Sequence, residues 1–160
     1  MKILITGISG RIGANLAQAL LQRGHSVRGL IWPQDARREK LAALDVELVE
    51  GTITNPADVE RAVSGVEVIC HLAAAFQGGG PFTNEQYFDI NVRGTFNMLE
   101  AARRKAGNLQ HFFYASTDAA YEKYIPGGVP IPISEDDFKV APVGQYAVTK
   151  ALGEQLSQGY

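Results

Sequence analysis

Short apolar runs alternate along this chain with segments whose apolar residues recur every three or four positions. Continuous apolar runs are typical of strands buried on both faces of a parallel sheet, whereas the second pattern is typical of helices that cover such a sheet. The strands are predicted at 3–5, 26–32, 46–49, 66–72 and 111–116. The helices are predicted at 12–23, 35–44, 56–63, 84–106 and 145–158.

Several boundaries carry their own signals. Thr83, with Gln86 three residues later, resembles a capping box and predicts the start of the long helix. Gly107 predicts its end, because glycine readily adopts the left-handed conformation that terminates helices. The glycines at 78–80, followed by proline, predict a loop, and the proline-rich segment 118–142 predicts a longer one.

The alternation of strands and helices predicts one α/β domain that spans residues 1–160. Five strands with a glycine-rich turn after the first indicate a Rossmann-like, doubly wound parallel sheet with strand order 3-2-1-4-5. In such a sheet a ligand lies beyond the carboxyl ends of strands one and four, where the strand order reverses. Residues that carry chemistry are therefore expected after these strands.

The turn after the first strand contains three glycines spaced three residues apart, Gly7, Gly10 and Gly13. Glycine permits a tight turn, lets the backbone approach a pyrophosphate and lets the following helix pack close to its strand. The helix that begins here directs free N–H groups and the positive end of its dipole at the phosphates. A purely structural turn is the alternative, since lone glycine motifs often have no ligand. The cofactor-binding residues predicted in this turn are Gly7, Ser9, Gly10, Arg11, Ile12 and Gly13.

Near the other end of the sequence, Tyr146 and Lys150 lie four residues apart in the last predicted helix and therefore share one of its faces. A free phenol has a pKa of about 10, which is too high for a base at neutral pH. A nearby ammonium favours the phenolate and brings it toward the range useful in general acid–base catalysis. The alternative is a solvent-facing Tyr/Lys pair, which is common on helices.

Together these motifs resemble the short-chain dehydrogenase/reductase superfamily, and more closely its extended branch, the NAD-dependent epimerase/dehydratase family. The Gly-x-x-Gly-x-x-Gly spacing and the Tyr-x-x-x-Lys pair carry the resemblance, and residues 71–74, 91–102 and 116–121 are similar to further family motifs. The resemblance covers the whole chain and implies the N-terminal, cofactor-binding part of such an enzyme. Family members are longer, which implies that most of the substrate pocket is built by residues beyond 160.

The resemblance also implies roles for single residues. Tyr146 would be the catalytic base, and Lys150 would tune it and bind the nicotinamide ribose. Thr117 would hydrogen-bond the reacting substrate oxygen, with Ser116 as the alternative one residue earlier, although either hydroxyl could instead cap the end of strand five. Asn91 would contact backbone or water, with packing in the helix interior as a serious rival. The remaining predicted cofactor-binding residues are Thr52, Ile53, Leu72, Ala73 and Ala74.

The sequence departs from the family pattern at three places. Strand two ends without the acidic residue that binds a ribose hydroxyl in NAD-selective relatives, and Asp35 follows only several residues later. Thr52 stands where the family usually has an aspartate that reads adenine. Asp118 matches an acid of the dehydratases, but Ala119 replaces their glutamate, which argues against sugar 4,6-dehydration. Weak discrimination between NAD and NADP is expected, because the acid at the end of strand two is absent. The choice of cofactor stays open, since four basic side chains could meet a 2′-phosphate: Arg11, Arg28, Arg37 and Arg38.

Composition argues against several other functions. The net charge is −2 and no basic stripe is present, which argues against nucleic-acid binding. No apolar stretch reaches the ~20 residues that span a membrane, and the first strand begins too early for a signal peptide, so a cytoplasmic protein is expected. Cys70 is the only cysteine, and a buried apolar role is expected for it. The histidines show no metal-ligand spacing, so no metal is predicted.

The sequence thus predicts an NAD(P)-dependent epimerase, dehydratase or reductase that transfers a hydride between a substrate carbinol carbon and the nicotinamide. The substrate would be a nucleotide sugar or another small carbonyl or alcohol compound, and the resemblance implies a homodimer formed by helices 84–106 and 145–158. The alternative is a non-catalytic dinucleotide-binding module, such as a redox-responsive regulator. The 160-residue chain is expected to bind cofactor yet to turn over little substrate.

Overall fold

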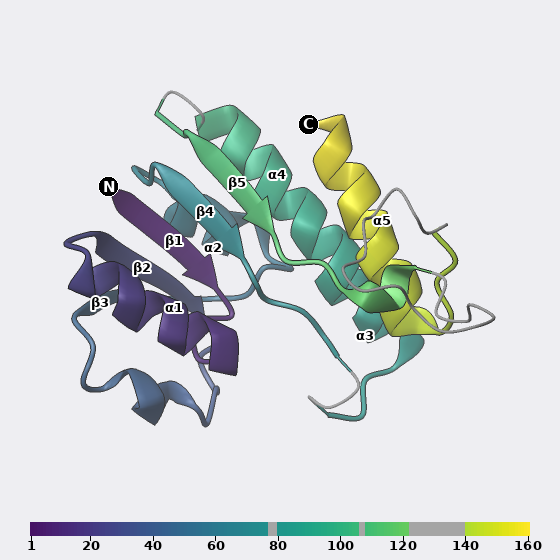
Figure 1. The fold of residues 1–160 in the computed structure, drawn as a ribbon, viewed down its shortest axis with the longest axis horizontal. Helices are drawn as coiled ribbons and strands as arrows, with labels where there is room; N and C mark the ends of the chain where they lie inside the picture. Colours follow the sequence, from purple (N-terminus) through teal and green to yellow (C-terminus); the bar gives the residue numbers. More distant parts are fainter. Residues whose placement is uncertain (77–79, 106–107, 122–139) are drawn as a thin grey trace, which may run out of the picture.

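The computed structural model describes residues 1–76, 80–105, 108–121 and 140–160, which form an α/β fold around a five-strand sheet (Figure 1). Neighbouring strands are parallel, and the strand order is β3-β2-β1-β4-β5. The predicted Rossmann-like fold class and strand order are confirmed. The strands are β1 (Lys2–Thr6), β2 (Ser26–Ile31), β3 (Val46–Glu50), β4 (Val68–His71) and β5 (His111–Tyr114). The α-helices are α1 (Arg11–Gln22), α2 (Pro56–Val63), α3 (Asn84–Phe88), α4 (Gly94–Lys105) and α5 (Gln145–Gly159).

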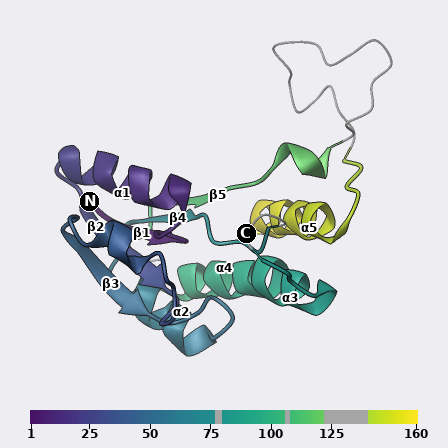
Figure 2. The same ribbon diagram turned by 90° about the horizontal axis from the view of Figure 1, so that it is seen from below.

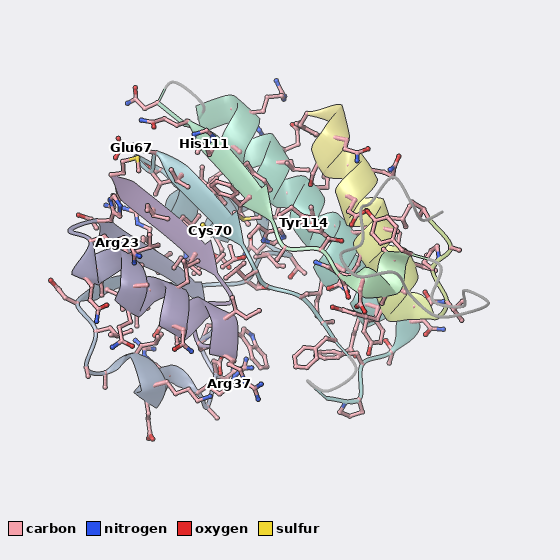
Figure 3. All side chains as sticks on the ribbon, viewed as in Figure 1. Arg23, Arg37, Glu67, Cys70, His111 and Tyr114 are labelled. Atoms are coloured by element: carbon pink, nitrogen blue, oxygen red, sulfur yellow. The ribbon has the colours of Figure 1, made fainter. Side chains whose placement is uncertain are left out.

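Helices cover both faces of the sheet, with α1 on one side and α2 and α4 on the other (Figure 2). Adjacent residues of a strand point to opposite faces, so Leu4 packs in the core beneath α2 and α4, whereas Ile3 and Ile5 pack beneath α1. Cys70, in the middle of β4, is half-buried against the core on the α1 side, and burial raises the pKa of its thiol (Figure 3). The α5 helix lies beside α3 and α4 rather than over the middle of the sheet.

The connection between β2 and β3 differs from the prediction. A single 3₁₀ turn, η1 (Arg38–Leu41), forms where the sequence predicts a helix over 35–44. Backbone N–H groups here bond three residues back, as in the 3.1 Å bond from Arg38 N to Asp35 O. Leu41 is the one fully buried side chain of the stretch, so no apolar stripe packs a regular helix against the sheet.

The predicted long helix forms as three joined pieces: α3, a π-helical turn η3 (Asp89–Arg93), and α4. Thr83 and Gln86 make the predicted capping box, with side-chain bonds to each other's backbone N–H of 3.2 and 2.9 Å. A π turn inserts one extra residue into a helix, and this one contains the buried Asn91. The predicted end of the helix at Gly107 lies outside the described residues.

Most of the two predicted loops also lies outside the described residues, which omit 77–79 and 122–139. The described part of the second loop contains a short 3₁₀ turn, η4 (Asp118–Ala120), and an isolated bridge that joins Tyr121 to Val140. In the ranges that the structure describes, no helix combines the length and the apolar character needed to cross a membrane.

Candidate active site

Packing explains two of the glycines in the turn after β1. Gly7 has a left-handed backbone with φ of +69°, and a Cβ atom there would lie 2.9 Å from the backbone nitrogen of Ala73. A Cβ atom on Gly13 would meet the Gly7 carbonyl oxygen and lie 2.7 Å from the Ile8 Cα. Gly10 is less constrained, because its nearest contact would be the Gly7 oxygen at 3.1 Å. The absence of side chains thus lets α1 begin close against β1 and the end of β4.

The amino end of α1 is open to a ligand. Gly10 is its N-cap, and no side chain among the described residues caps the helix. Ser9 is buried, whereas Arg11 is exposed and Ile12 is 69% exposed. An uncapped helix start that follows a glycine turn offers N–H donors and the positive end of the helix dipole. This geometry fits a pyrophosphate.

An acidic side chain lies beside this turn, although it follows the last residue of β2 by four positions. Asp35 accepts a hydrogen bond from Ser9 Oγ at 2.5 Å. Arg37 pairs with the same carboxylate, and its Nε and Nη2 each lie 3.0 Å from an Asp35 oxygen. Hydrogen bonds from Arg37, and secondarily from Ser9, lower the pKa of Asp35 to about 2 against the opposing effect of burial. A charged carboxylate therefore stands at the glycine turn, where the sequence pattern of β2 shows none.

Like Arg37, two more of the basic side chains considered for a 2′-phosphate have partners within the protein. Arg28 is 8% exposed and donates to the carbonyl oxygens of Ala62 and Ser64 at 2.8 and 2.6 Å, at the carboxyl end of α2. Arg28 is therefore a structural side chain and not a phosphate ligand. Arg38 is exposed and forms an ion pair with Glu50 of β3.

A buried hydrogen-bond network joins the ends of β1 and β4 to the long helix. His71 bonds to Thr6 Oγ1 through Nδ1 at 2.7 Å and to Thr95 Oγ1 through Nε2 at 3.0 Å. Thr95 donates its one hydroxyl proton to the Asn91 carbonyl oxygen, so Nε2 of His71 must donate and Nδ1 must accept from Thr6. The Thr6 oxygen also accepts from the two backbone N–H groups that follow His71. Burial, with Lys150 nearby, lowers the pKa of His71 to about 3 and keeps the ring neutral.

Asn91 ties the loop after β4 to α5. Its Oδ1 accepts from Ala75 N at 2.7 Å, and its Nδ2 donates to Ala75 O and to Thr149 Oγ1, both at 3.0 Å. Thr149 lies on α5 between Tyr146 and Lys150. Asn91 therefore influences the site through the backbone that it holds and through the placement of this helix.

Lys150 is nearly enclosed between α5 and β5. It is 4% exposed, its ammonium donates to the carbonyl oxygen of Ala115, and its Nζ lies 4.0 Å from the centre of the Tyr114 ring. Burial lowers the pKa of Lys150 from 10.5 to about 8, against the opposing effect of Glu154. Tyr146 is half-buried one turn earlier on the same face of α5. The pair thus stands at the carboxyl end of β5, on a helix held to the sheet.

The two candidate hydroxyls after β5 have different partners. Ser116 Oγ donates to the carboxylate of Glu154 on α5. Thr117 Oγ1 lies 3.3 Å from Asp118 Oδ1 and accepts from Ala119 N, also at 3.3 Å, which makes Thr117 the N-cap of η4. Ser116 is therefore bound to another element, whereas Thr117 is bonded within its own turn.

The other predicted cofactor-binding residues follow β3 and β4. Thr52 donates its N–H to Asp58 at 3.0 Å, and Ile53 is buried beneath Gly94. Residues 72–74 are half-buried and continue from the end of β4 past the glycine turn. The ends of β1, β3 and β4 thus place these backbone segments along one edge of the sheet.

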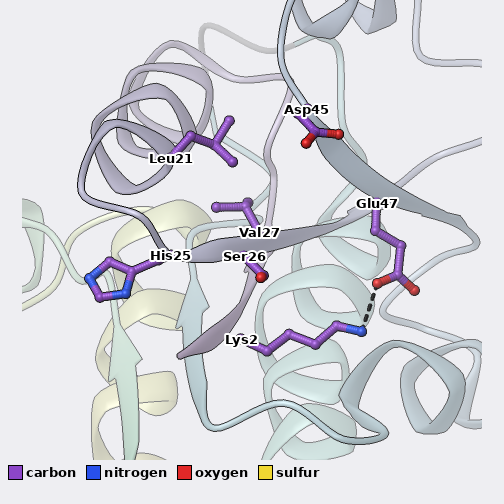
Figure 4. Close-up of a pocket in the computed structure, with 7 residues that line it drawn as sticks. All are labelled: Lys2, Leu21, His25, Ser26, Val27, Asp45 and Glu47. Atoms are coloured by element: carbon purple, nitrogen blue, oxygen red, sulfur yellow. Dashed lines mark ion pairs between the residues drawn. The ribbon is translucent and has the colours of Figure 1, made fainter.

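A separate hollow of about 340 Å³ lies at the opposite, amino edge of the sheet (Figure 4). It is lined in part by His25, Asp45 and the Lys2–Glu47 ion pair, whose Nζ and Oε2 are 2.8 Å apart. Because the glycine turn follows the carboxyl end of β1, this hollow is not part of the candidate active site.

The sheet order and the turn after β1 define the class of Rossmann-like dinucleotide-binding proteins. Within this class, the sequence model of one family, the NAD dependent epimerase/dehydratase family, matches residues 3–160. The chain belongs to this family, and the family membership predicted from the sequence is confirmed.

Individual relatives agree with this assignment. The 3-beta-hydroxysteroid dehydrogenase of Mycolicibacterium neoaurum is 38% identical over 124 residues, which are 74% of this chain and 32% of that protein. The 4-hydroxy-2-methyl-3-oxo-4-farnesyl-3,4-dihydroquinoline-1-oxide ketoreductase of Stigmatella aurantiaca is 32% identical over 158 residues, which are 98% of this chain and 45% of that protein. The crystal structure of the Bordetella bronchiseptica enzyme WbmG in complex with NAD and UDP is similar to this one, with a TM-score of 0.82. The two sequences are 30% identical, and the match covers 98% of this chain and 48% of the WbmG chain. This chain thus spans half or less of the length of each of these proteins.

Proposed function

We propose that this chain is the cofactor-binding part of an NAD-dependent oxidoreductase that interconverts a secondary alcohol and a ketone. The observation that carries the proposal is the placement of Tyr146 and Lys150. Asn91 holds their helix to the loop after β4, and the Lys150 ammonium bonds to the residue after β5. A proton-transferring pair would therefore share one edge of the sheet with the uncapped start of α1.

The side chains of this chain would move and hold protons around the bound cofactor. When bound, NAD supplies the acceptor for the hydride that leaves the alcohol carbon. Tyr146 takes the proton of the substrate hydroxyl, while Lys150 holds the ribose hydroxyls and stabilises the phenolate. Thr117 orients the reacting oxygen, since Ser116 is engaged by Glu154. In the reverse direction Tyr146 returns the proton to the ketone oxygen.

The carboxylate at the glycine turn supports a preference for NAD over NADP. Asp35 is charged and reaches Ser9, so it is placed to accept from ribose hydroxyls and to repel a 2′-phosphate. Arg37 offsets part of this charge, which keeps the expected preference moderate. The WbmG structure contains NAD, in line with this proposal.

The substrate class follows from the relatives and from one departure in the sequence. Two of the sequence relatives, those described above, are named as a hydroxysteroid dehydrogenase and a ketoreductase, and both names describe an alcohol–ketone pair. Ala119 beside Asp118 argues against the dehydratase reaction of the family. A nucleotide sugar is the second candidate substrate, because the WbmG structure holds UDP together with NAD.

Cofactor binding is the first test. Calorimetric titration of the folded chain with NAD is expected to show binding that is lost in Gly13→Ala, because the new Cβ would meet the backbone of Gly7 and Ile8. Gly159→Ala is the matched control, since a Cβ there meets nothing within 4 Å. A folded chain that binds neither NAD nor NADP would contradict the proposal.

Hydride transfer is the second test, followed by the absorbance of the reduced cofactor with hydroxysteroids, small ketones and UDP-sugars. In a longer chain that also contains the substrate-orienting residues, Tyr146→Phe is expected to lower kcat by about a hundredfold or more, because general acid–base catalysis contributes at least that much. NAD affinity is expected to stay within about twofold. Tyr160→Phe is the control, since Tyr160 is exposed and bonds to Glu100 instead. Binding of NAD without turnover of any substrate, in this chain and in a longer one, would favour the non-catalytic module.

A further inference from the structure

Glu154 lies on α5, four residues after Lys150 and eight after Tyr146, and therefore near the same helix face. Its Oε1 accepts a hydrogen bond from Ser116 Oγ, and its Oε2 accepts one from the Tyr121 hydroxyl at 3.3 Å. Both donors belong to the segment that follows β5. One carboxylate of α5 thus holds both ends of the stretch from 116 to 121.

This stretch carries the hydroxyl that the proposed reaction uses. Thr117 has an extended backbone, with φ of −156°, and its carbonyl oxygen accepts from Ala120 N at 3.3 Å. The next turn is closed by the bond from Tyr121 N to Asp118 O at 3.1 Å. The Thr117 hydroxyl is bonded inside this small turn, to Asp118 and Ala119. The anchors at the two ends of the stretch therefore set where the turn, and with it the hydroxyl, lies relative to α5.

The same carboxylate acts on Lys150. Burial disfavours the ammonium of Lys150, and the negative charge of Glu154 opposes this effect. Two other titratable groups near the ammonium carry no charge. Burial lowers the pKa of His71 on β4 and raises the pKa of Tyr114 on β5, so both side chains are neutral. The phenols near this site on the remaining packed elements are Tyr146 and Tyr121.

We propose that Glu154 is a positioning residue of the active site, which fixes the Thr117 segment against α5 and supplies the counter-charge for the Lys150 ammonium. This inference rests on the roles proposed above for Tyr146, Lys150 and Thr117 in hydride transfer. The two effects are separable, because holding the segment needs hydrogen-bond acceptors whereas the counter-charge needs an ionised carboxylate. Glu154→Gln keeps the volume and one acceptor oxygen but removes the charge.

The counter-charge is tested by following the titration of Lys150 directly, by NMR of ¹³C-labelled lysines in the folded 160-residue chain, with Lys150→Arg to assign the signal. In Glu154→Gln the ammonium is expected to bind its proton roughly three- to tenfold more weakly, because an opposite charge nearby favours the charged form. Ser116→Ala removes a hydrogen bond to Glu154 but keeps the charge of its carboxylate. It should leave the pH at which Lys150 titrates unchanged. Gln155→Ala, on the exposed side of α5, is the matched control and should also leave it unchanged.

The positioning effect is tested by amide hydrogen exchange in the same chains. The N–H groups of Ala120 and Tyr121 are expected to exchange about three- to tenfold faster in Glu154→Ala and in Ser116→Ala, because each loses a bond that closes the segment. The proposal is overturned if the Lys150 titration is unmoved in Glu154→Gln, or if exchange is unmoved in Glu154→Ala, while circular dichroism shows both variants folded. Neither measurement uses cofactor or substrate, so failure of the proposed function would show separately, as absent NAD binding or absent hydride transfer.

Discussion

At the scale of single residues, the charge held at the glycine turn has the clearest consequence for cofactor choice. Asp35→Asn is expected to reduce a preference for NAD over NADP about tenfold, because it removes repulsion toward a 2′-phosphate and frees Arg37 to bind one. Titration of both cofactors at one salt concentration measures this ratio. Asp45→Asn, at the amino edge of the sheet, is the matched control. An unchanged ratio in Asp35→Asn would mean that this carboxylate does not face the ribose.

The buried ammonium of Lys150 gives a prediction about pH. The folded chain holds the pKa of Lys150 at about 8, below the usual 10.5, so the ammonium is lost as the pH rises through about 8. NAD affinity is expected to fall over the same range, because the proposed ribose contact needs the charged form. The contribution of Lys150 to the free energy of unfolding changes with pH in the opposite direction to the NAD affinity. It rises between about pH 8 and 10.5, because only the unfolded chain still holds the Lys150 proton in this range.

Both trends are measured by NAD titration and by urea unfolding on either side of pH 8. Lys150→Met lacks the titrating group, and the difference between the two chains isolates it from the other lysines and tyrosines. If NAD affinity depends on pH as steeply in Lys150→Met, another group is responsible.

Some site residues follow from spacing along the chain and others do not. Tyr146 and Lys150 could be predicted to share a face, because four residues make about one turn of a continuous helix such as α5. Asp35 could not, because the chain turns back after β2, with Asp35 N bonded to Trp32 O at 3.0 Å. The partners of Glu154 were equally inaccessible, since they depend on how a distant segment packs on α5.

At the scale of secondary-structure elements, burial decides what the sequence reveals. All five strands could be predicted to within two residues at each end. The central strands β1 and β4 are covered on both faces and carry continuous apolar residues, whereas the edge strands β3 and β5 keep exposed side chains such as Glu47 and Phe113. The helix predicted over 35–44 is wrong, because apart from the exposed Ala36 its apolar residues are consecutive at 41–44 and give no stripe at helical spacing. The π turn η3 could not be predicted, since it depends on the partners that Asn91 finds in other elements.

The π turn leads to a prediction about stability. Asn91→Ala is expected to lower the free energy of unfolding by about 2 kcal/mol or more, because it removes three buried hydrogen bonds and leaves the N–H and C=O of Ala75 without them. Urea unfolding at neutral pH measures the change. Asn15→Ala is the control, since the exposed Asn15 side chain donates to the Arg11 carbonyl oxygen within α1, and a change below about 0.5 kcal/mol is expected. Equal effects of the two substitutions would show that Asn91 does not clamp α5.

At the scale of the whole molecule, the described residues include every element to which we assign cofactor binding and proton transfer. We therefore propose that residues 1–160 form an NAD-binding Rossmann domain. The matched region is only 45% of the Stigmatella ketoreductase and 48% of WbmG, and we propose that substrate orientation in such proteins depends on the additional residues. Orientation can account for ~7–11 kcal/mol of a barrier, which is why binding of NAD with little turnover is expected of this chain alone.

Exposed apolar side chains on three helices lead to a prediction about dimer formation. Phe88, Phe96 and Leu152 on α3, α4 and α5 are 47%, 44% and 41% exposed. The family resemblance implies that these helices meet their mates across a two-fold axis, and a two-fold dimer is also the commonest assembly. We therefore expect the chain to dimerise through this helical face.

Phe96→Glu and Leu152→Glu are expected to raise the dissociation constant of this dimer about a hundredfold or more. Burial of one such side chain contributes about 1.5–3 kcal/mol, and each residue occurs twice in a two-fold interface, so a single substitution acts at two places. Sedimentation equilibrium over a range of concentrations measures the constant. Phe113→Glu on β5 is the control, because Phe113 is 56% exposed yet lies on a strand outside this helical face. A native chain that stays monomeric at high concentration would show that no such dimer forms. A dimer that only Phe113→Glu dissociates would show that the interface lies elsewhere.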